Sequence, residues 1–308
     1  MKLEKIITLA NANVRLRFLA MERSLRATGC NLPLWVIPYD GTRFDLPANA
    51  IWWEIPEIKG LLAANRSHPM MAKYQCFTTE NYQYVDSDVI FLRNPETVLA
   101  EHDGFITSCG HWGNPDHTYT ETSLAVLKSI STCWQTRVFN AGQWACDRVL
   151  YSFEGIRSRC CDPQYIDTCL KFPFHDQPGT VLLVNLSGVS IYNLTLPPVC
   201  MESTWAGSYR DENYVAYWKD EFRKPYLLHW AGCSLADLPI NRLLTDYLTD
   251  EERRLWDQEI AQKRNQFARD QRSFKNRLGK LLRGFRAFQA ELQPKESSVP
   301  KDKSVTLS

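Results

Sequence analysis

Apolar residues in the first forty positions follow two different spacings, which predict a strand, a helix and a second strand. Residues 5–10 form a short apolar run that is typical of a buried strand. Apolar side chains then recur at helical spacing over residues 14–25, and Gly29 follows where a helix commonly ends. Residues 34–37 form a second apolar run. A crossover of this length makes the two strands parallel, so we expect a doubly wound α/β sheet.

The rest of the chain up to residue 248 continues to alternate between strand and helix patterns. We expect further strands at residues 82–85, 89–92, 104–109, 189–194 and 225–230. We expect helices at residues 61–79 with a break near Pro69, after Asn94, at 123–130 and at 141–152. Together these elements predict one α/β domain over residues 1–248, with a mixed sheet flanked by helices.

The character of the chain changes after residue 248. Residues 249–252 read as a helix start, with Thr249 or Asp250 at the cap. Residues 261–290 carry nine Lys or Arg and one Asp, with apolar side chains on one helical face: Phe274, Leu278, Leu281, Leu282, Phe285 and Phe288. We expect a basic amphipathic helix over residues 249–292 and a disordered tail over 293–308. The apolar face suits an anionic membrane surface, or packing on the preceding domain or a second subunit.

Charge and cysteine usage narrow the class of protein. The 308 residues include 36 Lys or Arg and 35 Asp or Glu, a balance that argues against a dedicated nucleic-acid binder. The ten cysteines are scattered without a C-x-x-C pair, so neither a zinc ribbon nor a thioredoxin motif is present. The N-terminus carries no secretory pattern and no window has 18 uninterrupted apolar residues. We therefore expect a cytoplasmic protein, with peripheral contact at the inner membrane surface as an option for residues 261–290.

Two acidic residues stand between apolar strands in the segment Tyr-Val-Asp-Ser-Asp-Val-Ile-Phe. Asp86 and Asp88 are two positions apart, so in extended backbone their side chains share a face. The carboxyl edge of a parallel sheet is where α/β proteins bind ligands. Carboxylate oxygens suit Mg²⁺ or Mn²⁺, and two acids wedged between buried strands are unfavourable unless a cation compensates them. The segment therefore predicts a divalent metal site.

Three further segments carry candidate chemistry, and each has a purely structural alternative. His229 ends an apolar strand and can complete a metal site, or it is a satisfied core histidine. Asp176 and Gln177 stand side by side at a helix start, where they can bind hydroxyl groups, or Asp176 is simply an N-cap. Asn140 precedes two small residues that allow close approach of a ligand, or it belongs to a tight turn.

The order of these motifs resembles that of GT-A-fold nucleotide-diphospho-sugar transferases, the broad group that includes glycogenin and the bacterial lipopolysaccharide galactosyltransferases. The resemblance runs over roughly residues 4–245: a first strand, a tyrosine–aliphatic–D-x-D strand, a Phe-Asn-Ala-Gly segment, an Asp-Gln pair and a late His-x-x-Gly. It implies a GT-A-like catalytic domain over residues 1–248. It also implies transfer of a sugar from a nucleotide-diphosphate donor, with UDP as the expected nucleotide.

The resemblance also implies roles for individual residues of this chain. Asp86, Asp88 and His229 would bind Mn²⁺, or Mg²⁺, that bridges the donor diphosphate. The other implied positions are Asn11, Tyr39 and Ser87 along the nucleotide, Lys73 on the donor, Asn140 on the donor or acceptor sugar, and Asp176 and Gln177 at the reaction centre.

One position departs from the family pattern. The family often follows the late His with a Lys-Pro-Trp segment that contacts the diphosphate. Here Gly232 is followed by Cys-Ser-Leu, and the nearest Lys-Pro pair, at Lys224, precedes His229 instead. The motif therefore leaves open which cation meets the diphosphate.

We expect a metal-dependent glycosyltransferase whose acceptor is a carbohydrate, a lipid or a protein. A metal stabilises the charge that grows on the leaving diphosphate. The resemblance favours retention of configuration, and the residues alone leave inversion open. One alternative is a nucleotidyltransferase that makes a nucleotide sugar, although residues 10–14 lack the Gly-rich loop of that class. The other alternative is a sugar-nucleotide-binding protein without catalysis.

Overall fold

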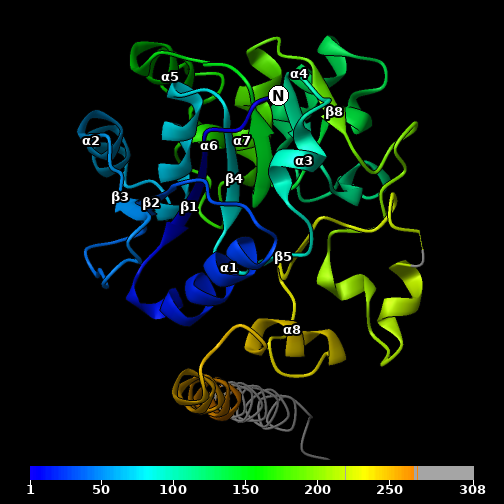
Figure 1. The fold of residues 1–308 in the computed structure, drawn as a ribbon. Helices are drawn as coiled ribbons and strands as arrows, with labels where there is room; N and C mark the ends of the chain where they lie inside the picture. Colours follow the sequence, from blue (N-terminus) through cyan, green and yellow to red (C-terminus); the bar gives the residue numbers. More distant parts are fainter. Residues whose placement is uncertain (219, 267–268, 270–308) are drawn as a thin grey trace, which may run out of the picture. The chain divides into compact units, whose positions relative to one another are not determined.

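The computed structural model of the chain describes residues 1–218, 220–266 and 269 (Figure 1). The chain forms two compact units, Met1–Arg253 and Arg254–Ser308. The expected division into residues 1–248, 249–292 and 293–308 stays a prediction, because most of the last two segments lies outside the described residues.

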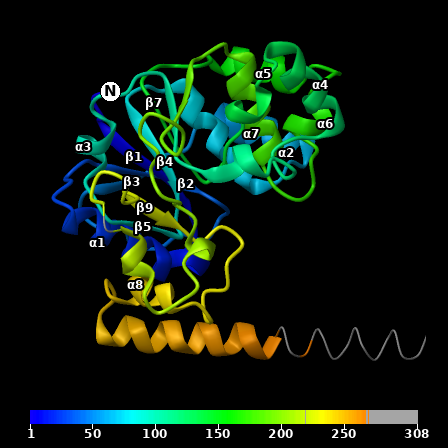
Figure 2. The same ribbon diagram turned by 90° about the vertical axis from the view of Figure 1, so that its right-hand side faces the viewer.

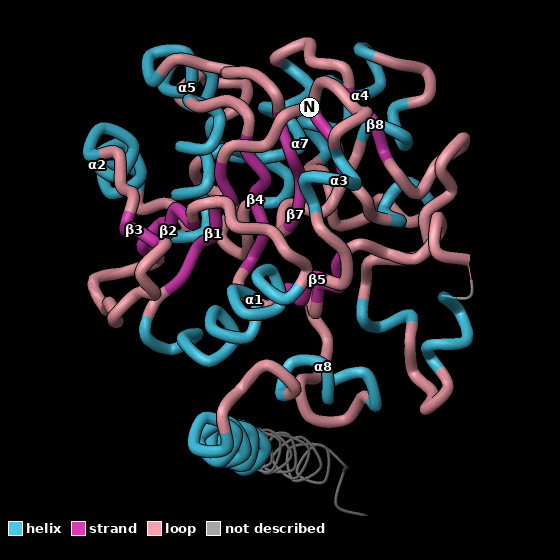
Figure 3. The backbone as a smooth tube through the Cα atoms, in the orientation of Figure 1, coloured by secondary structure: helices cyan, strands magenta, loops and turns pink. Residues whose placement is uncertain are grey.

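A seven-stranded mixed sheet forms the centre of the first unit (Figure 3). Its strands, in spatial order, are β3 (Ala50–Trp52), β2 (Leu34–Pro38), β1 (Lys5–Ala10), β4 (Tyr82–Asp86), β7 (Gln143–Cys146), β6 (Phe105–Thr107) and β8 (Ile191–Asn193). β1 is parallel to β2 and β4, whereas β7 is antiparallel to both of its neighbours. The expected mixed α/β sheet is confirmed.

Helices cover the two faces of this sheet. The α-helices are α1 (Arg15–Ala27), α2 (Pro56–Asn65), α3 (Pro95–Leu99), α4 (Glu121–Ile130), α5 (Phe153–Cys160), α6 (Ile166–Cys169), α7 (Gln177–Leu186) and α8 (Arg242–Thr245). The 3₁₀ helices are η1 (Ala12–Val14), η2 (Pro69–Thr78), η3 (Gly110–Gly113), η4 (Trp134–Arg137), η5 (Ala206–Ser208), η6 (Tyr214–Trp218) and η7 (Pro239–Asn241). Figure 2 shows α1 and α3 on one side of the sheet and α4, α5, α6 and α7 on the other.

The opening strand–helix–strand unit forms as the apolar pattern predicts. The apolar positions Leu16, Phe18 and Leu25 of α1 are buried, which fixes the face that the helix turns towards the sheet. Gly29 has a φ of +85°, a left-handed conformation that glycine adopts without strain directly after a helix. The crossover places the carboxyl ends of β1 and β2 side by side, with Ala10 opposite Pro38.

The helix expected at residues 141–152 is wrong. Residues Gln143–Cys146 instead form β7, a strand in the interior of the sheet between β4 and β6. Each of its four residues is buried, and Trp144 stacks on Tyr84 with ring centroids 4.3 Å apart. In a short run that is buried on both faces, the spacing of apolar residues does not distinguish a strand from a helix. Its conformation is decided by pairing with the strands on both sides. The break expected near Pro69 is confirmed: α2 ends at Asn65, and η2 begins at Pro69.

A second, two-stranded sheet pairs segments that are far apart in the sequence. β5 (Val89–Phe91) runs antiparallel to β9 (Leu227–His229), with Val89 opposite His229. The pairing extends one step further, because the backbone N–H of Trp230 donates to the carbonyl oxygen of Asp88 at 3.1 Å. Figure 2 shows β5 and β9 side by side. This pairing brings the end of β9 to the segment that follows β4.

A helix occupies residues 250–266 at the end of the described chain. Its start has the expected cap: the backbone N–H of Glu252 donates to the hydroxyl of Thr249 at 3.3 Å, and the Glu252 carboxylate accepts from the N–H of Thr249 at 2.9 Å. The apolar side chains expected on one helical face at positions 274–288 lie outside the described residues, so neither the membrane nor the packing alternative is tested. In the part of the chain that is described, no helix combines the length and apolar character needed to cross a membrane.

Candidate active site

The four chemical motifs of the sequence meet at one edge of the seven-stranded sheet. β4 ends at Asp86, which lies opposite Leu9 near the end of β1. β7 runs antiparallel to β4, so its leading segment, residues 140–142, reaches the same edge. The edge holds Asp86, Asn140, Asp176 just before α7 and Gln177 at its start, around one cavity of about 460 Å³.

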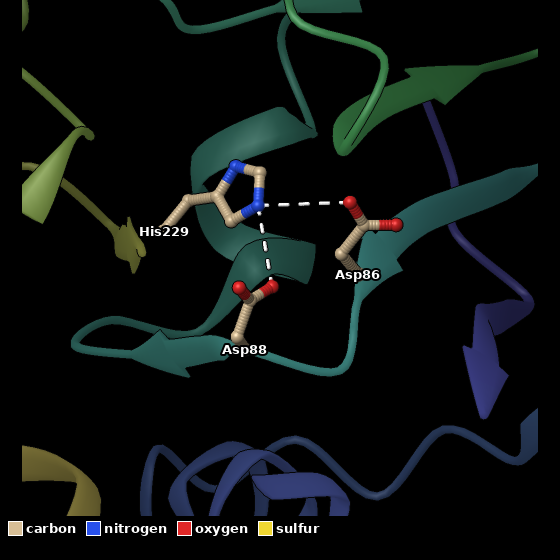
Figure 4. A group of neighbouring side chains, drawn as sticks. All are labelled: Asp86, Asp88 and His229. Carbon is tan, nitrogen blue, oxygen red and sulfur yellow. Dashed lines mark ion pairs between the residues drawn. The ribbon is translucent and has the colours of Figure 1, made fainter. Parts of the chain in front are cut away.

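Asp86, Asp88 and His229 form a three-ligand cluster at this edge (Figure 4). His229 Nε2 lies 3.6 Å from Asp86 Oδ2 and 3.3 Å from Asp88 Oδ1. One ligand atom from each residue lies within 4.8 Å of the other two. Two carboxylates and one imidazole are a donor set that suits Mn²⁺ or Mg²⁺. The alternative that His229 is only a hydrogen-bonded core histidine does not account for this arrangement, since its partners are two acids.

The electrostatics of the cluster show that it favours positive charge. Burial opposes ionisation of Asp88, but the facing His229 outweighs it and lowers the pKa of the Asp88 carboxyl to about 2. Burial also lowers the pKa of the His229 imidazole, but Asp88 and Asp86 outweigh this and raise it above its ordinary value. The two carboxylates that raise the pKa of His229 are the groups that would attract a dication.

Gly142 leaves the space that the cluster needs. A Cβ at this position would overlap His229 Cε1 and would lie 2.5 Å from Asp86 Oδ2 and 2.8 Å from Asn140 Oδ1. The segment is also fixed to β4, since the N–H of Asp86 donates to the carbonyl oxygen of Gly142 at 2.8 Å. Three side chains converge on the position of the missing methyl group, so the cluster depends on glycine here.

A buried lysine connects Asp86 with Asp176. Lys73 Nζ lies 3.3 Å from Asp86 Oδ1 and 3.0 Å from Asp176 Oδ2, and it donates to the carbonyl oxygen of Ala141 at 2.8 Å. Burial alone would lower the pKa of Lys73, but Asp176 and Asp86 raise it above its ordinary value. The Tyr84 hydroxyl donates to the same Asp86 oxygen at 2.6 Å. Lys73 therefore holds the two carboxylates in fixed positions.

Asp176 does not act as the N-cap of α7 through its side chain, although it occupies that position. Its carboxylate instead faces Lys73 and accepts from the Thr180 hydroxyl at 3.3 Å. Burial raises the pKa of Asp176, and Lys73 partly opposes that rise. The neighbouring Gln177 accepts from the N–H of Ala141 at 3.2 Å, so its amide is held across the cavity. The capping alternative is wrong, and both residues line the cavity.

Asn140 forms a tight turn, and it also faces the central cavity. Its side-chain oxygen accepts from the N–H of Gly142 at 2.7 Å, which is the tight turn of the structural alternative. It also lines the 460 Å³ cavity together with the metal-candidate cluster.

A second cavity of about 370 Å³ lies beside the first, at the carboxyl ends of β1 and β2. Asn11, Tyr39 and Ser87 line it. Their implied role in nucleotide binding stays a prediction. The side chain of Asn11 is engaged on both sides: Nδ2 donates to Asp40 at 2.7 Å, and Oδ1 accepts from the N–H of Asn13 at 3.1 Å. Asn11 thus shapes the wall of the cavity, while Tyr39 and Ser87 contribute its other surfaces.

Sequence reasoning missed the basic residue of this cavity. Arg17, on the first turns of α1, lines the 370 Å³ cavity together with Asp86, Ser87 and Asp88. One signal was available in the sequence. Acids are the favoured residues in the first turn of a helix, but α1 has none there and carries the basic residue Arg17 instead.

Sequence reasoning also missed a third cavity, of about 420 Å³, which adjoins the central cavity at His229. Its walls include Cys109, His111 and Trp205, and it shares Asn140 and His229 with the central cavity. Its residues come from four separate segments, with no local motif to join them.

Known proteins resemble this chain in structure but not detectably in sequence. No family model matches the sequence, and no curated protein matches it. The galactosyltransferase LgtC, solved with donor and acceptor sugar analogues, has a TM-score of 0.51 and 14% identity, over 81% of this chain and 99% of that one. The bifunctional glycosyltransferase WbbM has a TM-score of 0.51 and 10% identity over 83% of this chain, which spans 51% of WbbM.

A weaker likeness is to the glycosyltransferase GlyE of Streptococcus pneumoniae TIGR4, with a TM-score of 0.46 and 12% identity over 84% of this chain and 64% of GlyE. The matches to LgtC and WbbM show that the chain has the GT-A fold, as the order of its sequence motifs implied.

Proposed function

We propose that this chain is a metal-dependent glycosyltransferase that moves a sugar from a nucleotide-diphosphate donor, UDP-linked, to an acceptor hydroxyl. One observation carries the proposal: Asp86, Asp88 and His229 converge within 4.8 Å between cavities at the carboxyl edge of a GT-A sheet. The match to a galactosyltransferase solved with donor and acceptor sugar analogues supports a sugar-nucleotide substrate.

The chain's own residues supply what a divalent ion needs at this position. Asp86, Asp88 and a neutral His229 would hold Mn²⁺ or Mg²⁺, and Gly142 leaves the space for their approach. The ion, when bound, would stabilise the negative charge that develops on the leaving diphosphate. Lys73 orients Asp86, because its ammonium lies 3.3 Å from the carboxylate.

The two cavities suggest how the donor lies. The nucleotide would occupy the 370 Å³ cavity along Asn11, Tyr39 and Ser87, and the sugar would extend into the central cavity beside Asn140 and Gln177. The fixed amide of Gln177 offers a polar group to the sugar without adding charge.

The carboxylates of the central cavity support retention of configuration. An inverting enzyme needs a carboxylate base beside the acceptor hydroxyl. Among the described residues that line this cavity, the acids are Asp86, Asp88 and Asp176. The first two belong to the metal-candidate cluster, and Asp176 is buried and paired with Lys73. None of the three is left to take a proton from the acceptor.

The acceptor would enter through the 420 Å³ cavity. Trp205 on its wall is 44% exposed, and its indole N–H is held by the carbonyl oxygen of Ala231 at 2.9 Å. A fixed, exposed indole offers a flat apolar face of the kind on which sugar rings stack. His111 on the same wall adds a polar group. These features support a carbohydrate acceptor, or the sugar portion of a glycolipid or glycoprotein.

Thermal unfolding with a panel of nucleotide sugars tests the proposal. UDP-, GDP- and CMP-linked sugars are compared with and without Mn²⁺, and release of the free nucleotide is then measured. We expect a UDP-sugar to stabilise the fold by about 2.7 kcal/mol at a hundredfold its dissociation constant, in the presence of Mn²⁺. We also expect slow release of UDP.

The two alternatives give different results in the same experiment. A nucleotidyltransferase would form a nucleoside triphosphate when pyrophosphate is added to the nucleotide sugar. A non-catalytic binding protein would be stabilised without releasing any nucleotide. If no combination of donor and metal stabilises the protein, and none leads to nucleotide release, the proposed class is overturned.

A further inference from the structure

The donor diphosphate needs a positive partner besides the metal. Asp86 and Asp88 already balance the charge of one dication, so a bound diphosphate would bring excess negative charge to the same place. This charge grows as the sugar leaves, so a cation that contacts the diphosphate stabilises the transition state. The lysine that the family pattern would put after Gly232 is absent, since Cys233 follows.

Two cationic side chains line the donor and central cavities within the described part of the chain, Lys73 and Arg17. Lys73 is fully buried, and its ammonium is already shared among Asp86, Asp176 and the carbonyl oxygen of Ala141. It neutralises protein carboxylates and has no hydrogen left for a diphosphate oxygen.

Arg17 is the opposite case. It is half-buried, and among the described residues its guanidinium has neither a hydrogen bond nor an ion pair. It lines the 370 Å³ cavity together with Asp86, Ser87 and Asp88. An arginine without a partner beside a metal-candidate cluster has all five of its N–H donors available to a ligand.

The position of Arg17 is not explained by the stability of α1. The flanking residues Leu16 and Phe18 are buried, which fixes the rotation of the helix and directs Arg17 to the cavity side. A basic residue near a helix N-terminus is unfavourable in the field of the helix dipole unless an anion is nearby. No acid occupies the first turn of α1 to offset it.

Resting on the proposed function, we propose that Arg17 binds the diphosphate of the nucleotide-sugar donor from the α1 side of the metal. The planar guanidinium can donate two parallel hydrogen bonds to phosphate oxygens, which fixes the diphosphate in one orientation. In this chain, α1 rather than the segment after His229 thus supplies the cation for the leaving nucleotide.

The test compares Arg17→Ala and Arg17→Lys with the wild-type protein. The matched control is Arg15→Ala, because Arg15 is exposed on the same helix and lines neither cavity. Binding of UDP, GDP and the corresponding nucleosides is measured by calorimetry in saturating Mn²⁺. We expect Arg17→Ala to weaken nucleoside-diphosphate binding about 10- to 100-fold, the range for hydrogen bonds to charged groups. We expect nucleoside binding to change less than about threefold.

Arg17→Lys should recover part of the lost diphosphate affinity, since it keeps the charge but loses the paired hydrogen bonds. Arg15→Ala should bind both probes like the wild type. Diphosphate binding within about threefold of wild type in Arg17→Ala would overturn the assignment while leaving the proposed function intact. Equal weakening of diphosphate and nucleoside would also overturn it, since the effect would then not be specific to the phosphates. A wild-type protein that binds neither UDP nor GDP with Mn²⁺ would instead overturn the proposed function.

Discussion

Replacing Lys73 by methionine tests the buried ion pairs of Lys73 with Asp86 and Asp176. Methionine keeps much of the length of the side chain but removes the ammonium that lies 3.0 Å from Asp176 and 3.3 Å from Asp86. Asp176 is buried, so the variant would leave a carboxylate without its cation in a place that water does not reach. The carbonyl oxygen of Ala141 would also lose its donor.

The size of the expected loss follows from the burial of the pair. Removing one partner of a buried ion pair costs about 3–5 kcal/mol, because the other charge is left uncompensated. In a domain of this size the midpoint of thermal unfolding should fall by roughly 6–20 °C. The control is Lys59→Met, since the pair of Lys59 with Glu54, at 2.9 Å, is exposed on the surface. Its removal should cost at most about 1 kcal/mol.

The loss in Lys73→Met should depend on pH in a defined direction. Burial already raises the pKa of Asp176, and without Lys73 it should rise further. A carboxyl group whose pKa is higher in the folded state binds more protons when folded, so stability falls as pH rises through that pKa. Urea unfolding between pH 5 and 8 should therefore show the deficit of the variant shrinking towards pH 5.

A second substitution checks the assignment to Asp176. Asp176→Asn in the Lys73→Met background removes the uncompensated carboxylate charge and should recover part of the lost stability. The coupling energy between the two substitutions should be about 0.5–3 kcal/mol. The reasoning is refuted if Lys73→Met costs less than about 1 kcal/mol, or if its deficit is the same at pH 5 and pH 8.

Three further predictions concern the site itself. Gly142→Ala should weaken Mn²⁺ binding at least about tenfold by calorimetry, since its methyl group overlaps the cluster, whereas Gly113→Ala, with open space around it, should not. The pKa of His229 is raised above 6.5, so below that pKa Mn²⁺ must displace a proton from the imidazole. The affinity of the protein for Mn²⁺ should then fall about tenfold per pH unit, and an affinity that is unchanged from pH 8 to pH 5 contradicts this. Trp205→Ala should raise the acceptor KM and leave donor hydrolysis unchanged; an equal loss in both would exclude Trp205 from the acceptor site.

The elements that the sequence predicts well are those with a local signal. The strand–helix–strand opening has a clear change of period, and Asn94 caps α3 by accepting from the N–H of Glu96 at 2.9 Å. The D-x-D segment is recognisable from its local pattern, because two acids between apolar strands are unfavourable without a partner. β7 was missed because burial on both faces removes the alternation that identifies a strand.

The contacts that assemble the site depend on pairing over long distances in the chain. His229 reaches Asp88 because β9 pairs with β5, and no local pattern contains that register. The Lys73–Asp176 pair joins η2 to the start of α7, where the local pattern favoured a helix cap. Arg17 could be read only as a basic residue on a helix until the cavity beside it was known. The candidate ligands could thus be predicted from the sequence, but not the cation network that supports them.

The metal dependence of nucleotide release tests the central claim most directly. The protein is stripped of metal with a chelator, and UDP release from a UDP-sugar is followed as Mn²⁺ is added back. The wild type is compared with Asp88→Asn, which keeps the shape of the ligand but removes its charge, and with Asp167→Asn as an exposed control. We predict that release by the wild type and Asp167→Asn rises with Mn²⁺ to saturation and that Asp88→Asn stays near zero. Release by Asp88→Asn at the wild-type rate, or equal release with and without Mn²⁺, would contradict the account.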